Sequence, residues 1–335
     1  MEASAIMPST RRQNHLDAIS GLLIVQVVLL HILILTRCTE NCIYKIVFQQ
    51  ILVFYMPWFF FKNGLFYRER NMKDAIQYVM RRLAKPYIVI SVVSVAATIL
   101  YYTILYYTCG SDLSGTFDII ARLKYIFWHG ALAENLPLYF LLSLGLVRIV
   151  IATIDKFCGK NGSSVTLVAS VISLIVLHQL HYRLPDCIIN SFIGILFFSI
   201  GRLSSSLLTD NKIANIAAII YLLTIIVIPS FVDFRTGHTV NGNFWIWVVI
   251  SICGILSINK LFMAINKVFT LNWLSYIGRQ SMAIYVIHFL LIFLLTRISV
   301  DYLSILEGTS ALFGLVTTST TIILIPLHKT INKII

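Results

Sequence analysis

The chain has 335 residues, of which 58% are apolar and only 12% are charged. Soluble domains usually carry about 25% charged residues, so this composition excludes a soluble globular protein. The formal charge of +12 does not indicate nucleic-acid binding, because the basic residues are scattered between apolar runs and form no stripe on one face. We therefore expect the chain to contact the lipid bilayer and not nucleic acid.

Ten apolar runs recur along the chain, and most are long enough to cross a bilayer as a helix. The predicted spans are 17–36, 44–66, 87–107, 137–154, 164–180, 188–205, 214–232, 244–258, 280–297 and 310–328, of which the eighth is short. The sequence thus predicts an all-α fold, a polytopic membrane helical bundle of about ten transmembrane helices in a single domain, residues 1–335. The first span is not a cleaved signal, because no small-residue cleavage site follows it.

The distribution of basic residues predicts the orientation. Eighteen Lys and Arg residues fall at or near the side of the N-terminus and 7 on the opposite side, with Lys62 left at the inner end of the second span. Because cytoplasmic segments carry the excess of Lys and Arg, both termini are predicted to be cytoplasmic, with residues 1–16 as a cytoplasmic N-terminal segment. We expect a multi-pass protein of the cell inner (plasma) membrane.

Two charged segments are not expected to span. Residues 68–86, the most charged part of the chain, predict a cytoplasmic basic amphipathic helix that lies along the inner membrane face and ends at Pro86. Residues 117–129 predict a segment at the outer interface, anchored by Phe127 and Trp128. The other outside loops are short, so any chemistry must use side chains of the helices.

The six cysteines show no metal-ligand spacing, and no metal is expected. Cys38, Cys42, Cys109 and Cys187 fall on the outer side of the predicted topology. The sequence leaves open whether two of them form a disulfide or all are small, free apolar side chains.

His31 is the leading candidate for chemistry. It lies about two thirds of the way through the first predicted span, which Asp17 opens. A titratable side chain is costly in hydrocarbon and usually faces the bundle interior or a water-filled cavity. Imidazole is also the commonest general base, since its unperturbed pKa is about 6.5. The alternative is a histidine that only hydrogen-bonds a neighbouring helix.

Other polar residues in or near the predicted spans have either a functional or a purely structural role. His288, midway through the ninth span, is either a site residue or a polar contact between helices. Arg81, Arg82 and Lys85 either bind the phosphates of a cytosolic ligand, as Arg does with two parallel hydrogen bonds, or only set the topology. Lys62 and Asn63 lie in an aromatic run, where Lys62 either extends to the inner interface or lines a ligand tunnel.

Five sequence blocks in order resemble the integral-membrane acyltransferase 3 family, most closely its fucose 4-O-acetylase-like branch. The blocks are LDAISGLLIVQVVLLH, which ends at His31, then MPWFFFKNGLFY, RRLAKPY, LPLYFLLSL, and LSYIGRQSMAIYVIH, which ends at His288. The resemblance covers nearly the whole chain. It departs from the family pattern at Ser20, where many members have Arg or Lys, and at Tyr139, where Trp is usual; Arg11 or Arg12 is a possible substitute for the missing cation.

The resemblance implies ten core helices, cytosolic acetyl-CoA as the donor substrate and an extracytoplasmic carbohydrate hydroxyl as the acceptor, with no permanently bound cofactor. It implies His31 as the catalytic residue, which takes the proton of the attacking hydroxyl. We expect Asp17, His288, Lys62, Asn63 and Tyr139 to support catalysis or bind substrate. We expect the CoA-binding residues to be Arg81, Arg82, Lys85 and Arg279.

These observations predict a membrane-bound O-acetyltransferase that acts on a cell-surface or exported polysaccharide or on its lipid-linked precursor. The alternative from another class is a lipid-linked glycan flippase, which would favour inverted repeats or matched Gly/Pro-broken helices; the sequence shows neither. A glycan polymerase would favour a large charged outside loop, and the longest outside stretch is only residues 108–136.

Overall fold

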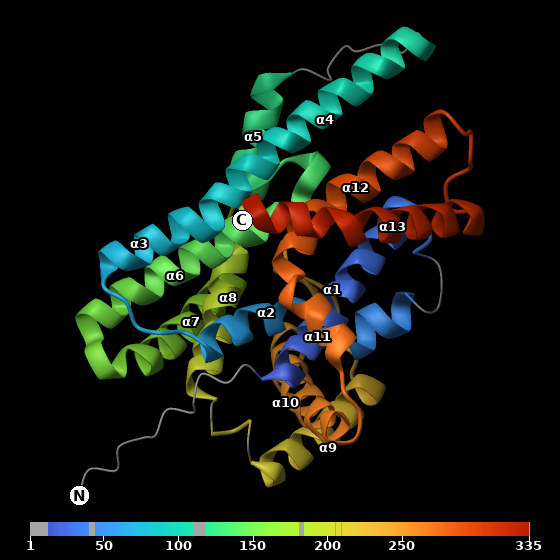
Figure 1. Ribbon diagram of the computed structural model, residues 1–335. Helices are drawn as coiled ribbons and strands as arrows, with labels where there is room; N and C mark the ends of the chain where they lie inside the picture. Colours follow the sequence, from blue (N-terminus) through green and yellow to red (C-terminus); the bar gives the residue numbers. More distant parts are fainter. Residues whose placement is uncertain are drawn as a thin grey trace, which may run out of the picture.

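The computed structural model describes residues 13–39, 44–109, 118–180, 184–204, 206–208 and 210–334. These residues are mostly helical and form one bundle with a small hairpin (Figure 1). The elements are α1 (Asn14–Leu35), η1 (Tyr44–Ile51), α2 (Tyr55–Leu65), α3 (Met72–Val79), η2 (Met80–Ala84), α4 (Lys85–Cys109), α5 (Ile119–His129), η3 (Ala133–Leu138), α6 (Tyr139–Cys158), η4 (Gly159–Asn161), α7 (Gly162–Leu180), α8 (Asp186–Leu203), α9 (Asn211–Val227), β1 (Phe231–Asp233), β2 (His238–Asn241), α10 (Phe244–Val268), α11 (Asn272–Arg279), α12 (Ser281–Asp301) and α13 (Ser310–Ile334). Arg11, Arg12 and Cys42 lie outside the described residues.

The predicted membrane bundle is confirmed at the level of its fold class. Within the described ranges, seven helical stretches are long and apolar enough to cross a membrane, and α9 is a shorter apolar helix of 17 residues. One of these stretches, Ile120–Gln179, contains α6 and nearly all of α5 and α7. The number of ten spans and the orientation of the termini stay predictions.

The second predicted span, 44–66, is not one helix. A π-helical segment, η1, ends at Ile51, and α2 starts at Tyr55. Side chains from two other helices bond the carbonyls that the break frees. Gln26 Nε2 of α1 donates to the carbonyl of Leu52 (3.1 Å), and Trp247 Nε1 of α10 donates to that of Val53 (3.3 Å). The break is tolerated because partners inside the protein replace the missing helical hydrogen bonds.

The prediction that a helix ends at Pro86 is wrong. The helix begins at Met72, where the Asn71 side chain accepts the N–H of Asp74 (2.8 Å), and it continues through η2 directly into α4. Pro86 follows the π-helical turn as the second residue of α4. A wide π turn shifts the hydrogen-bond register locally, so the missing N–H of proline falls where the ladder is already interrupted.

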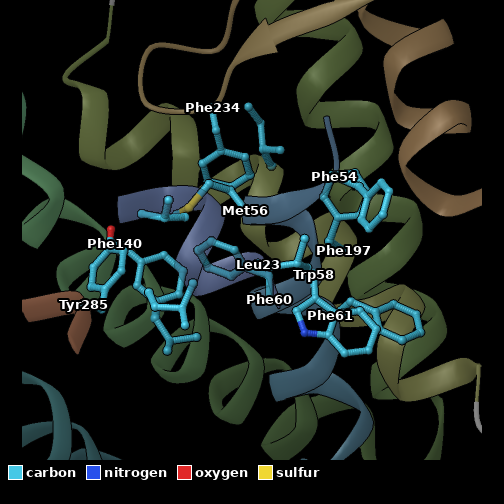
Figure 2. Close-up of a cluster of buried hydrophobic side chains, with 14 of the residues drawn as sticks. Leu23, Phe54, Met56, Trp58, Phe60, Phe61, Phe140, Phe197, Phe234 and Tyr285 are labelled. Atoms are coloured by element: carbon cyan, nitrogen blue, oxygen red, sulfur yellow. The ribbon is translucent and has the colours of Figure 1, made fainter. Parts of the chain in front are cut away.

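The core consists mainly of apolar side chains from α1, α2, α6, α8, α10 and α12. Figure 2 shows part of it, with the rings of Trp58, Phe60 and Phe61 from α2 beside Leu23 of α1. Trp58 and Trp247 are fully buried. Helices at the edge of the bundle show the reverse pattern: many apolar residues of α4 and α9 are exposed, for example Ile226 at 76%. Such a surface suits contact with lipid.

Two glycines bring α1 and α11 into backbone contact. A Cβ on Gly21 would lie 2.1 Å from the carbonyl oxygen of Leu274, and one on Gly278 would lie 1.7 Å from that of Asp17. Small residues allow helix backbones in a membrane to approach closely, and here no larger side chain fits. The contact fixes α11, and α12 after it, against α1.

Candidate active site

The structure brings His31 of α1 and His288 of α12 together. The Nε2 atom of His288 lies 3.0 Å from the Nδ1 atom of His31, and the two ring centroids are 5.0 Å apart. The two residues are 257 positions apart in sequence. Both were candidates from the sequence, where each was an isolated histidine in an apolar run, and the fold makes them one pair.

The hydrogen bonds of this pair determine which nitrogen carries each proton. His288 Nδ1 lies 2.7 Å from the carbonyl oxygen of Tyr285, which can only accept, so Nδ1 of His288 is the donor. In a neutral ring, Nε2 of His288 is then an acceptor and bonds the Nδ1–H of His31. The lone pair of His31 is therefore on Nε2, where it can accept a proton from a substrate hydroxyl.

The environment holds this pair in place. His288 is fully buried, whereas His31 is partly exposed. The ring of Phe289 meets His31 edge-on at 5.1 Å, and the ring of Tyr285 lies 5.6 Å from His288. Tyr285 is itself fixed, because its hydroxyl donates to the carbonyl of Pro137 (2.6 Å). A base oriented by packed neighbours keeps its geometry during reaction.

Lys62 of α2 lies in a buried polar cluster with Asp17 and Ser20 of α1. Its Nζ atom is 3.0 Å from Asp17 Oδ1 and 2.9 Å from Ser20 Oγ. The indole N–H of Trp58 also donates to Ser20 Oγ (3.0 Å). The side chains of Lys62 and Asp17 are only 20% and 8% exposed. The structure thus places a lysine ammonium beside Ser20, the position at which the sequence lacks the family's cation.

A cavity of about 320 Å³ lies beside this cluster and extends to Tyr285, the neighbour of His288, but His31 and His288 themselves do not line it. Ser20, Lys62 and Asn63 line one part of it, and Tyr285, which packs on His288, lines another. Along α1, Ser20 and His31 are separated by about 16 Å at a rise of about 1.5 Å per residue. The lining combines the polar side chains of Lys62 and Asn63 with the aromatic rings of Phe140 and Tyr285, which are the lining residues nearest to the histidines.

Arg148 of α6 also lines the cavity, and sequence analysis had counted it only as a topology signal. Its Nη2 atom donates to Asn63 Oδ1 (2.7 Å), and its guanidinium lies 4.5 Å from the centroid of the Tyr78 ring. No carboxylate among the described residues forms an ion pair with Arg148, and its Nε atom is buried without a hydrogen bond. A half-buried guanidinium of this kind favours an anionic ligand.

Asn135 is a second residue that sequence analysis missed. It is fully buried and lies in η3, where its backbone leaves helical geometry. Its Nδ2 atom donates to the carbonyl of Val286 (3.0 Å), two residues before His288, and to Ser94 Oγ (3.2 Å). Asn135 thereby ties α4 to α12. Arg148 lies within the predicted span 137–154, and a charged residue inside a span can mark a functional site. Asn135 lies just before that span and carries no such mark in the sequence.

Other predicted site residues are not brought to the cavity. Arg81, Arg82 and Lys85 are exposed on η2 and at the start of α4, and they do not line it. Arg279 is exposed at the end of α11, where it donates to Ser275 Oγ (3.1 Å). Tyr139 is buried at the start of α6 and is not a lining residue either.

The outer cysteines show no disulfide where they are described. Cys38 and Cys187 are free thiols. Cys42, and the side chain of Cys109, lie outside the described part of the chain. The disulfide that the sequence left open thus finds no support at Cys38 or Cys187.

Comparison with known protein families matches most of the chain to a family model. The family model described as an acyltransferase domain, that of acyltransferase 3, matches residues 14–328. No curated protein and no solved structure matches the chain. The matched region starts at the first residue of α1 and reaches into α13, so it includes both histidines and every residue that lines the cavity. The chain therefore belongs to the acyltransferase 3 family of membrane acyltransferases.

Proposed function

We propose that the protein transfers an acetyl group from cytosolic acetyl-CoA to a hydroxyl of a cell-surface or exported polysaccharide, or of its lipid-linked precursor. The observation that carries this proposal is the histidine pair: within a membrane acyltransferase, a base is positioned with its lone pair on a defined atom, His31 Nε2. A general base at this place suits attack by an alcohol on a thioester.

The reaction would proceed in two steps. The acceptor oxygen forms a bond to the thioester carbonyl carbon while His31 Nε2 takes the hydroxyl proton, and His288 Nε2 keeps the bond from His31 Nδ1. The tetrahedral intermediate then collapses, the carbon–sulfur bond breaks, and the imidazolium returns the proton to the leaving CoA sulfur. The products are an acetyl ester and CoA. His288 acts as a positioning residue, since it touches His31 and no reacting atom.

The donor would occupy the 320 Å³ cavity. Arg148 and Asn63 supply a guanidinium and an amide for phosphate oxygens or for the pantetheine amides, and Lys62 adds an ammonium beside Ser20. Tyr285 stands where the cavity approaches the histidines. We propose Arg148 as the principal phosphate-binding residue, ahead of Arg81, Arg82, Lys85 and Arg279, because it lines the cavity and they do not.

The orientation supports opposite access for the two substrates. With cytoplasmic termini, as the 18-to-7 distribution of basic residues predicts, Asp17 and Lys62 lie toward the cytoplasm and His31 lies toward the outer side. The donor would enter from inside and the acceptor from outside, which suits an enzyme of the cell inner (plasma) membrane.

The test uses purified protein in lipid nanodiscs with acetyl-CoA labelled in its acetyl group. We expect His31-dependent release of CoA and transfer of label to glycan from the source cells. His328→Ala is the matched control, because His328 also lies in a long apolar helix but bonds Tyr276 on α11. A flippase would consume no acetyl-CoA. Equal turnover by the wild type and His31→Ala would refute the proposal.

A further inference from the structure

A second cavity of about 580 Å³ lies away from the histidine pair, between α5, α7, α8, the β1–β2 hairpin and the start of α10. Phe244, the first residue of α10, lines it. The opposite end of α10, Val268, is 24 residues later and so about 36 Å away, and Asn272, which follows it in the chain, accepts a hydrogen bond from Asn14 Nδ2 (3.2 Å) at the start of α1. The second cavity is therefore at the end of the bundle opposite the start of α1.

The second cavity has mainly apolar walls, from leucine, isoleucine and valine side chains and the aromatic rings of Trp128 and Phe244, with polar side chains set among them. Asp186, Asp233, Thr236, His178 and His238 contribute acceptors and donors, and Trp128 contributes an indole ring. Trp128 is 40% exposed, and His238 is exposed as well, so the cavity reaches the surface. An interface-anchoring role alone would account for Trp128, but it would not require carboxylates and imidazoles around the same hollow.

Charged contacts hold the walls in a fixed shape. Asp186 Oδ2 accepts hydrogen bonds from Arg235 Nη1 of the hairpin (2.5 Å) and from His129 Nδ1 of α5 (2.7 Å). Asp233 accepts the N–H of Arg235 (3.1 Å) and the hydroxyl of Thr236 (3.0 Å). These bonds tie the hairpin to α8 and α5, so the site is preformed.

Asp186 also keeps an acceptor for a ligand. The residue is 4% exposed and lines the cavity, yet its second oxygen, Oδ1, takes no hydrogen bond from any residue that the structure describes. Oδ1 is thus open to the cavity, where a donor group of a ligand can take the place of water. Hydroxyl groups are such donors, and they donate strongly to carboxylates.

We propose that this cavity binds an uncharged stretch of the carbohydrate acceptor, as a site separate from the one at His31. A sugar ring combines hydroxyl donors at its edge with an apolar face of C–H groups, which matches the two carboxylates and the indole ring. Asp186 and Asp233 share the single guanidinium of Arg235, so a glycan that carries carboxylates or phosphates is disfavoured here.

The separation from His31 implies a long acceptor. Buried rings fill the space between the hairpin and the histidine pair: Phe234 packs on Phe60 (5.4 Å between centroids), Phe60 on Phe140 (4.9 Å), and Phe140 on Tyr285 (5.2 Å). Figure 2 shows these four residues in the same cluster. One small sugar cannot occupy both places, so the proposed substrate is an oligosaccharide or polymer. This inference rests on the proposed function.

The experiment measures saccharide binding without turnover, by calorimetry in nanodiscs. The probes are de-O-acetylated fragments of four to eight sugars from the source cells' own surface glycan, their constituent monosaccharides, and hexagalacturonate as an anionic comparison. The variants are Trp128→Ala, His238→Ala and, as the matched exposed tryptophan on α11, Trp273→Ala. Thermal unfolding of each variant checks that it is folded.

We expect the fragments to bind the wild type and Trp273→Ala equally, and Trp128→Ala and His238→Ala at least about 5-fold more weakly. Monosaccharides and hexagalacturonate should bind at least about 10-fold more weakly than the fragments. No binding of fragments, or equal binding by both cavity variants and wild type, overturns the proposal. Two readouts separate the two questions: fragment binding by Trp128→Ala and His238→Ala tests the second cavity, whereas failure of the proposed function would appear as acetyl-CoA turnover that does not depend on His31.

Discussion

Lys62 and Arg148 line the same cavity, but their replacement by Met should affect different properties. Lys62→Met should mainly lower stability, and Arg148→Met should mainly weaken donor binding. Lys62→Met removes the ammonium that faces Asp17 at 3.0 Å, in a pair whose side chains are 20% and 8% exposed. Breaking a fully buried ion pair costs about 3–5 kcal/mol. With the partial exposure of Lys62 we expect about 2–3 kcal/mol of lost stability. The double variant Asp17→Asn/Lys62→Met should recover most of it, because no buried charge then remains at this pair.

Arg148→Met leaves no carboxylate behind in the described part of the chain, so its stability should fall by only about 1.5 kcal/mol, the low end for a hydrogen bond of a charged group, because the guanidinium is only half-buried and its partner Asn63 is neutral. Its effect should appear in donor binding instead. A charge-assisted hydrogen bond contributes about 1.5–3 kcal/mol, which corresponds to roughly a 10- to 100-fold rise in KM for acetyl-CoA.

Unfolding in mixed micelles, followed by tryptophan fluorescence, measures the stability of both variants, and initial rates of CoA release measure KM. If Arg148→Met loses as much stability as Lys62→Met while KM stays constant, Arg148 is a structural cation and the assignment of the donor cavity fails. If the double variant is no more stable than Lys62→Met, the pair with Asp17 does not account for the loss.

The remaining predictions concern the base, the basic surface and the orientation. His31→Ala should lower the rate of acetyl transfer by about 10²–10⁴-fold, while the protein stays at normal abundance in the membrane. His288→Ala should lower kcat with little change in KM for acetyl-CoA. Full activity of either variant would show that the replaced residue takes no part in the mechanism. Arg82→Gln should raise KM for acetyl-CoA less than Arg148→Met does, because Arg82 is exposed outside the cavity; a larger rise would restore the sequence-based assignment. A reporter active only in the cytoplasm should give signal when fused after Lys333 and none after Asp112, and the reverse result would overturn the orientation.

Most of the fold could be predicted from hydropathy, since a long apolar run in a membrane protein has few options besides a helix. The exceptions are places where long-range contacts decide. The break between η1 and α2 depends on Gln26 and Trp247, which donate to the freed carbonyls from other helices. The continuation through Pro86 depends on a local π turn. Neither contact is visible in a run of apolar residues.

The candidate site was predictable in part. His31 and His288 stood out because an imidazole is unexpected in hydrocarbon, but their pairing depends on the packing of α1 against α11 and α12. Lys62 was weighed as a tunnel residue from its aromatic surroundings. From the sequence, Arg148 was counted among the residues that set the topology. An arginine near a span end can either set the topology or bind an anionic ligand, and only its position in the cavity distinguishes these two roles.

The contact between Gly21 and Gly278 determines when during synthesis the histidine pair can form. Gly278 follows Gly21 at the same separation in sequence as His288 follows His31, so one backbone contact sets the alignment of both pairs. Membrane helices are made and inserted from the N-terminus onward. A nascent chain therefore carries His31 in the bilayer without its orienting partner until α11 and α12 have been synthesised.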